Sequence, residues 1–190
     1  MKMFIRAVFA TVVALTAASH AVADEYNETI ERFRSSGAGD MIDVAYGYAV
    51  FPTVGKGGIG LGGAYGEGQV FAAGESVGTA ALRQVTVGFQ LGGQAFSQMI
   101  LFQDKRAFDD FTSGNFEFGA QATAVALTAA AGAEASTQGS GTNVSGGKND
   151  ASISSTGFTK GMAIFTIAKG GLMYEASIGG QKFKYTPNKK

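Results

Sequence analysis

The stretch Gly58-Ile59-Gly60-Leu61-Gly62 alternates glycine with a large apolar residue, with the period of two that is typical of a β-strand. Other short apolar runs are separated by turn-forming residues, which predicts a series of strands. These runs cover residues 48–51, 69–71, 84–89, 97–102, 116–127, 163–167 and 172–185. Glycine inside strands is typical of sharp bends, bulges or close backbone approach. The pattern therefore predicts a strongly bent, Gly-rich antiparallel β-sheet, or a barrel-like core.

The same stretch, extended to Gly63, also matches the G-x-G-x-x-G pattern of dinucleotide-binding sites. Such a site needs the glycines to join a strand to a helix, with an acidic residue about 20 positions later. Here Tyr65 and Gly66 continue the texture of a strand or turn, and no amphipathic helix follows. We therefore expect no nucleotide and no other cofactor.

Two segments have helical patterns. In residues 24–34, Tyr26, Ile30 and Phe33 share one face, and the Gly/Ser-rich residues 35–39 predict the end of this helix. Residues 104–113 begin with Asp104 as a helix cap and are followed by Gly114, which suits a helix end. The prediction is an α+β fold with two or more helices packed against the sheet.

The composition of the chain limits the number of domains and the classes of function. The chain has 190 residues, enough for one domain, which we expect over residues 24–190. Residues 137–150 are rich in Gly, Ser, Thr and Asn, which predicts a flexible loop or, alternatively, an exposed hairpin tip. Its 15 Lys and Arg residues balance its 15 Asp and Glu residues, so no net charge favours nucleic acid as a partner. The chain has no Cys, which excludes disulfides, thiolate metal sites and a lipid-modified cysteine.

The N-terminus has the pattern of an export signal. Lys2 and Arg6 precede an apolar run over residues 8–18, and residues 21–23 form an A-x-A cleavage site. The alternative, a membrane anchor, would need about 20 apolar residues. We therefore predict that residues 1–23 are a signal peptide and that the protein is periplasmic or secreted, without a lipid anchor.

Cleavage there would remove His20, which is the one histidine of the chain. A Ser-His-Asp triad, a Cys-His pair and a histidine-ligated zinc site are then impossible. Carboxylate or lysine chemistry stays open, so a hydrolase based on carboxylates is an alternative. The sequence favours a protein that is not an enzyme, with no catalytic residue and no metal ligand.

A faint repeat marks the candidate binding residues. An Ala-apolar-Phe run precedes Lys56-Gly57-Gly58, and a second one precedes Lys169-Gly170-Gly171, with spacings that differ by one residue. A lysine beside unhindered backbone N–H groups can hold a phosphate, although a lysine at a turn is more often only solvated. We hypothesise that Lys56 and Lys169 lie on the same side of the sheet and, with these glycines, bind an anionic head group.

Several motifs in order resemble the SYLF domain family. They are Ala45-Tyr46-Gly47-Tyr48-Ala49-Val50-Phe51-Pro52, Lys56 to Gly63, Gly66-Glu67-Gly68, Gly88 to Gln94, Ala107-Phe108 with Phe111, Phe118 to Ala122, and Lys169-Gly170-Gly171-Leu172. The chain departs from the family at residues 79–82, where a Trp-Ser-x-Pro-like stretch is usual and Thr79-Ala80-Ala81-Leu82 stands instead.

The resemblance implies lipid binding, since the family's domain binds lipid and is actin-associated in eukaryotes. Together with the export signal, it implies a non-enzymatic protein of the bacterial cell envelope that binds an anionic phospholipid or another amphiphile. An envelope protein is a further possible partner. The alternative is a structural or protein-interaction module of the periplasm. The first helix carries Asp24, Glu25, Glu28 and Glu31, so it should not be attracted to anionic lipid.

Overall fold

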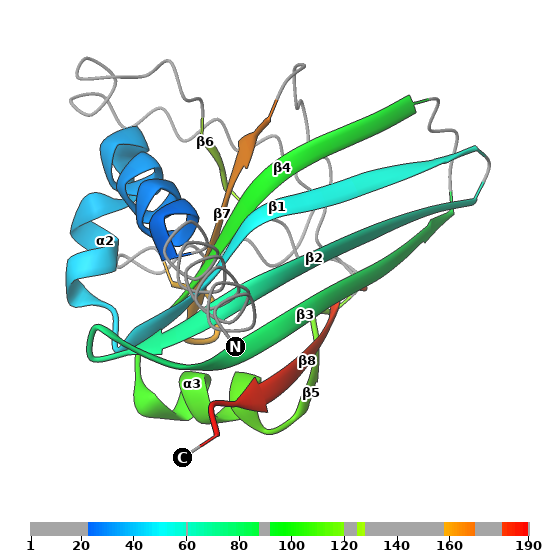
Figure 1. Ribbon diagram of the computed structural model, residues 1–190. Helices are drawn as coiled ribbons and strands as arrows, with labels where there is room; N and C mark the ends of the chain where they lie inside the picture. The colour runs from blue at the N-terminus through cyan, green and yellow to red at the C-terminus, as the bar shows by residue number, and fades with distance from the viewer. Residues whose placement is uncertain are drawn as a thin grey trace, which may run out of the picture.

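A computed structural model describes residues 23–59, 61–87, 92–119, 125–127, 158–169 and 180–189. Its eight-stranded sheet has the order β5-β8-β3-β2-β1-β4-β7-β6 (Figure 1). Neighbouring strands are antiparallel, except that β6 runs parallel to β7. The strands are β1 (Gly47–Ile59), β2 (Leu61–Ala72), β3 (Glu75–Val87), β4 (Gly92–Phe102), β5 (Asn115–Glu117), β6 (Val125–Leu127), β7 (Met162–Ala168) and β8 (Lys182–Pro187).

The sheet curls into a half-barrel, which gives it an inner and an outer face (Figure 1). The inner face carries the larger apolar core, and helix α3 (Lys105–Thr112) packs against it through Phe111. The Phe111 ring lies 4.9 Å from that of Phe102 on β4 and 5.2 Å from that of Phe183 on β8. One aromatic side chain thus joins two strands that are far apart in the sheet.

A second core lies between the outer face of β1, β4 and β7 and the N-terminal helices. Ile30 and Phe33 of the first helix (residues 23–33) pack there against Met99, Leu101 and Phe165. No residue of β3 or β8 belongs to this core as far as the chain is described. The helices therefore cover one half of the outer face, and the outer side chains of β3 and β8 lie beyond this core.

The predicted end of the first helix at residues 35–39 is confirmed: the helical conformation breaks at Gly37, where the chain kinks. The π-helical turn η1 (Arg34–Ala38) spans this kink, and a second helix, α2 (Gly39–Val44), follows it. Gly37 adopts a φ of 109° inside this turn, a conformation that suits glycine. Arg34 also donates a hydrogen bond of 2.5 Å to the Asp43 carboxylate, which ties the turn to α2.

A β-bulge interrupts β1 just before its glycine-rich half. The register of β1 shifts between Val50 and Thr53 against β2, and between Phe51 and Val54 against β4. Ser97 on β4 donates a 2.7 Å hydrogen bond to the Pro52 carbonyl, which satisfies that carbonyl inside the bulge. Because of the extra residue, Phe51 and Val54 face the same inner core although they are three positions apart.

The single strand predicted over residues 116–127 is wrong. The segment contains two short strands, and they lie at opposite edges of the sheet: β5 pairs with β8, whereas β6 pairs with β7. The helix predicted at 104–113 is confirmed as α3, and the Asp104 side chain accepts a 2.8 Å hydrogen bond from the Ala107 backbone N–H. The predicted α+β class, with a strongly curled sheet, is confirmed. The predicted loop at 137–150 lies outside the described residues.

Candidate functional site

Lys56 lies on the inner face near the far end of β1. It pairs across the sheet with Ala64 on β2 and Gln94 on β4, and its side chain is half-buried. The next residue, Gly57, lies opposite Gly63 and Gly93. The outer face therefore has a row of glycines at this end of the sheet, where only backbone is presented.

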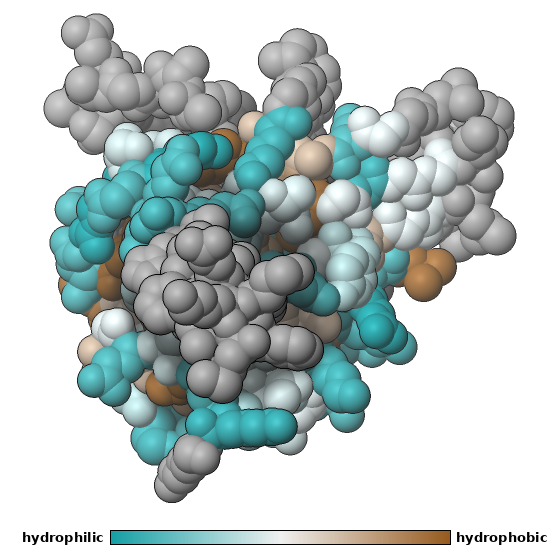
Figure 2. Space-filling model, in the orientation of Figure 1, coloured by the Kyte–Doolittle hydropathy of each residue, from teal (hydrophilic) through white to brown (hydrophobic). Residues whose placement is uncertain are grey.

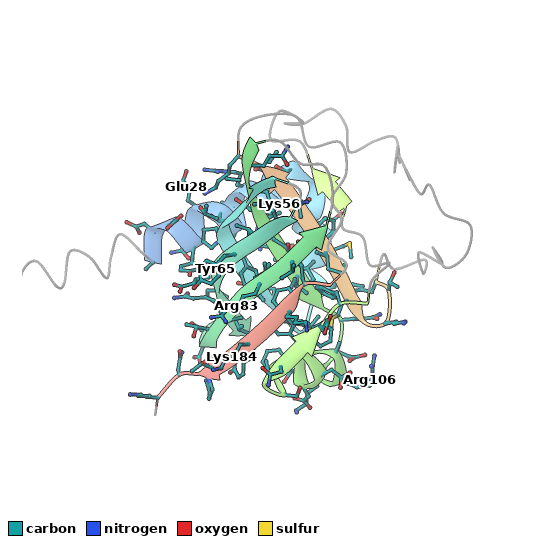
Figure 3. The ribbon with its side chains drawn as sticks, turned by 90° about the vertical axis from the view of Figure 1, so that its right-hand side faces the viewer. Glu28, Lys56, Tyr65, Arg83, Arg106 and Lys184 are labelled. Carbon is teal, nitrogen blue, oxygen red and sulfur yellow. The ribbon has the colours of Figure 1, made fainter. Side chains whose placement is uncertain are left out.

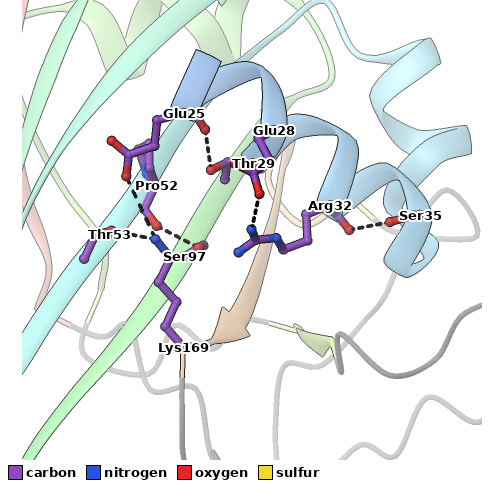
Figure 4. A network of polar contacts seen from close by, with 9 residues as sticks. All are labelled: Glu25, Glu28, Thr29, Arg32, Ser35, Pro52, Thr53, Ser97 and Lys169. Atoms are coloured by element: carbon purple, nitrogen blue, oxygen red, sulfur yellow. Dashed lines mark hydrogen bonds and ion pairs between the residues drawn. The ribbon is translucent and has the colours of Figure 1, made fainter. Parts of the chain in front are cut away.

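Lys169 follows β7 and holds the first helix in place. Its ammonium donates a 2.7 Å hydrogen bond to the Thr53 hydroxyl and lies 4.0 Å from the Glu25 carboxylate (Figure 4). Its side chain is 29% exposed. These contacts join β7, the bulge of β1 and the N-terminal helix, so the ammonium already has structural partners.

The two lysines lie on opposite faces of the sheet, so the hypothesis that they share one side is wrong. Lys56 is two residues from Val54 and therefore shares its inner face. Lys169 is two residues from Ile167, which packs in the outer core. The two segments already differ at their phenylalanines, since Phe51 faces the inner core and Phe165 the outer core. The bulge in β1 offsets the one-residue difference in spacing, so each lysine lies on the same face as its phenylalanine. Gly170 and Gly171 lie outside the described residues.

A different group of basic residues does come together on the outer face. Arg83 on β3 pairs directly with Lys182 on β8, and Lys184 is two residues further along β8, on the same face. All three side chains are exposed. We call Arg83, Lys182 and Lys184 the basic patch. Figure 3 shows Arg83 and Lys184 on neighbouring strands, beside Tyr65 of β2.

Tyr65 extends the patch by one strand, because it pairs with Arg83 in the register of β2 and β3. It is 49% exposed, and its hydroxyl donates a 2.5 Å hydrogen bond to the Glu67 carboxylate. This hydrogen bond raises the pKa of Tyr65 above its usual value. The Glu67 carboxylate thus has the Tyr65 hydroxyl as a hydrogen-bond partner.

Sequence reasoning did not find the basic patch. Arg83 and Lys182 are about one hundred positions apart, and no local motif links them. The alternating Lys182-Phe183-Lys184 was the available signal, since one apolar residue between two lysines in a strand predicts one buried and one charged face. That β8 pairs with β3, which places Arg83 beside these lysines, could be learned only from the order of strands in the sheet.

The described residues hold no group of three His, Cys, Asp or Glu side chains that could bind a metal ion. None of the described helices has the length and apolar character needed to cross a membrane. On the face seen in Figure 2, hydrophobic residues show only as small separate areas among hydrophilic ones.

The fold is thus an α+β half-barrel whose exposed chemistry includes a cluster of basic side chains. Residues 83–186, more than half of the chain, match the Ysc84 family, described as Las17-binding protein actin regulator. The chain belongs to this family, which confirms the resemblance to the SYLF domain. The comparison with curated proteins gave no match. The matched region begins at Arg83 and includes all three residues of the basic patch.

Proposed function

We propose that this chain is a non-enzymatic, phospholipid-binding protein of the bacterial cell envelope. Membership of the Ysc84 family is the observation that carries the proposal, because the family is a lipid-binding or actin-associated module rather than a known enzyme. The exposed basic residues of the outer face supply the charge that an anionic phospholipid attracts.

The cell envelope enters the proposal through residues 1–23, which have the pattern of a signal peptide. Cell fractionation with N-terminal sequencing tests this part. We expect a periplasmic or secreted protein that begins at Asp24. A cytoplasmic protein that keeps Met1 would contradict the envelope location while leaving lipid binding open.

Vesicle co-sedimentation tests the binding function. We expect the purified, processed protein to sediment with vesicles that contain phosphatidylglycerol and to stay in the supernatant with phosphatidylcholine vesicles. High salt should release it, because screening weakens attraction between exposed charges. Failure to sediment with either kind of vesicle would overturn the proposal.

A protein-interaction module is the second candidate function. The printed description of the family, a Las17-binding actin regulator, is the observation that favours it. Cross-linking in intact cells, followed by mass spectrometry, distinguishes the two. A single envelope protein captured in constant stoichiometry, together with no binding to vesicles, would favour this second candidate.

A further inference from the structure

We propose that the outer face of β2, β3 and β8 is the surface that meets an anionic phospholipid bilayer, with the basic patch as its charged contact. This inference rests on the proposed function and assigns it to a place in the fold. Lys56 and Lys169 do not form such a surface, because they lie on opposite faces and Lys169 is engaged by Thr53 and Glu25.

The charges of this face are unbalanced. Two carboxylates lie beside the patch: Glu117 lies 3.5 Å from the Lys182 ammonium, and Glu67 accepts the hydrogen bond of Tyr65 but keeps its negative charge. Three cations thus stand against two carboxylates. Within the described part of the chain, Arg83 and Lys184 belong to no ion pair within 4.0 Å. Two cations on neighbouring strands are therefore available to lipid phosphates.

The contrast with α3 supports this reading. Lys105 and Arg106 are also exposed, but their charges are matched within the helix by Asp109 at 2.7 Å and Asp110 at 3.4 Å. Although α3 carries two exposed basic residues, its surface therefore has no net positive charge. The basic patch differs because its strands bring no equal number of carboxylates to the same face.

The shape and the remaining side chains of the face suit a bilayer. Tyr65, Arg83 and Lys182 form one row across three strands, which spans about 10 Å at the usual strand spacing. Tyrosine is enriched at the boundary between membrane and water. Val85, two residues from Arg83 on the same face, is 79% exposed and adds an apolar contact. No residue of the helix-covered outer core comes from β3 or β8 in the described structure.

The test compares two double variants that remove the same charges. Arg83→Gln/Lys184→Gln takes one arginine and one lysine from the patch, and Arg106→Gln/Lys160→Gln takes one of each from exposed positions elsewhere. We expect the first variant to bind phosphatidylglycerol vesicles about tenfold or more weakly than wild type, and the second to change binding less than about twofold. Equal losses in both variants, or no loss in either, overturn the inference.

Wild-type binding separates this result from a failure of the proposed function. If the wild type binds and the patch variant binds equally well, the face is wrong and the function stands. If the wild type does not bind vesicles, the function fails and the inference fails with it. An acidic protein is the other partner that a basic patch would suit. Failure of the wild type to bind vesicles would favour such a protein partner.

A fluorescent label gives a second measurement that does not depend on charge. The chain has no cysteine, so Val85→Cys can be labelled at one position with an environment-sensitive dye. Val44→Cys is the matched control, because Val44 is 70% exposed but lies on α2. We expect anionic vesicles to shift the emission of the label at position 85 to the blue and to leave the label at 44 unchanged. The opposite pattern assigns the contact to α2 and overturns the inference.

Discussion

The side chains of Gln98 and Gln181 form a reciprocal amide pair inside the half-barrel. Each amide nitrogen donates to the other side-chain oxygen, at 2.9 Å and 3.1 Å, and both residues are fully buried. Gln98 is on β4 and Gln181 directly precedes β8, and these strands are separated in the sheet by β1, β2 and β3. The pair therefore joins the two sides of the curl across its interior.

The first prediction is that Gln98→Met destabilises the protein by about 1–3 kcal/mol, because the Gln181 amide would then be buried without its partner. The double variant Gln98→Met/Gln181→Met should cost less than the sum of the two single changes, since both polar groups are replaced together. Urea unfolding of the four proteins measures this coupling. Strictly additive costs would show that the two amides do not stabilise each other.

The second prediction concerns two glycines of neighbouring strands. A Cβ at Gly68 on β2 would lie 2.5 Å from the Val50 carbonyl oxygen and 2.6 Å from the Phe51 ring, so Gly68→Ala should destabilise the sheet. A Cβ at Gly55 on β1 would meet nothing within 4 Å. Gly55→Ala should therefore be neutral or slightly stabilising, through the unfolded state.

Thermal unfolding measures both alanine variants. We expect a clear loss for Gly68→Ala, on the order of 1–3 kcal/mol. A variant at Gly55 that is as unstable as the variant at Gly68 would be evidence against the close approach of β1 and β2 as the reason for glycine at position 68.

The third prediction concerns alkaline pH. Tyr48 is half-buried and stacks on Phe71 at 5.0 Å, and burial raises its pKa above the usual 10.0, partly offset by Arg34. The folded state thus holds the phenolic proton more tightly than the unfolded state. Its contribution to stability is fully present below pH 10.0 and is lost as the pH rises through the higher pKa of the folded protein.

Tyr48→Phe should therefore reduce the loss of stability between about pH 8 and about pH 11. Urea unfolding of wild type and variant at both pH values provides the measurement. An unchanged pH dependence in the variant would show that Tyr48 does not titrate as its burial implies.

The sequence was most informative where structure depends on neighbouring residues. Helix α3 could be predicted because Asp104 caps it and Gly114, with a φ of 123°, ends it. The strands of the first half could be predicted from alternation and turns. The split of residues 116–127 between two edges of the sheet could not, because pairing partners are set by packing across the whole domain and not by local pattern.

Lys56 and Lys169 lie on opposite faces because their segments do: Phe51 faces the inner core and Phe165 faces the outer core. The similarity of the segments around Lys56 and Lys169 suggested equivalent positions, and both β1 and β7 do pair with β4. The extra residue of the β1 bulge offsets the one-residue difference in spacing, so each lysine keeps the face of its phenylalanine. A bulge is stabilised by long-range contacts, here the hydrogen bond from Ser97 to Pro52, so no motif near Lys56 reveals it.

The fourth prediction separates the two lysines. Lys169→Gln removes the cation that Glu25 faces and changes the bond to Thr53, so the first helix should be held less firmly. The cost should be about 1 kcal/mol or less, because the pair is partly exposed and its charges are screened. Lys56→Gln, on the other face of the sheet, should leave this helix unaffected.

Hydrogen exchange measures this difference directly. We expect faster exchange in residues 23–33 of Lys169→Gln than in wild type or in Lys56→Gln, with unchanged exchange in β2 and β3. Vesicle binding gives a second test of the two lysines, with Lys56→Gln, Lys169→Gln and the double variant on phosphatidylglycerol vesicles. Because the lysines lie on opposite faces, the loss of binding in the double variant should not exceed the sum of the losses in the two single variants. A loss larger than that sum would show that Lys56 and Lys169 act on one head group, in conflict with the register of β1, β4 and β7.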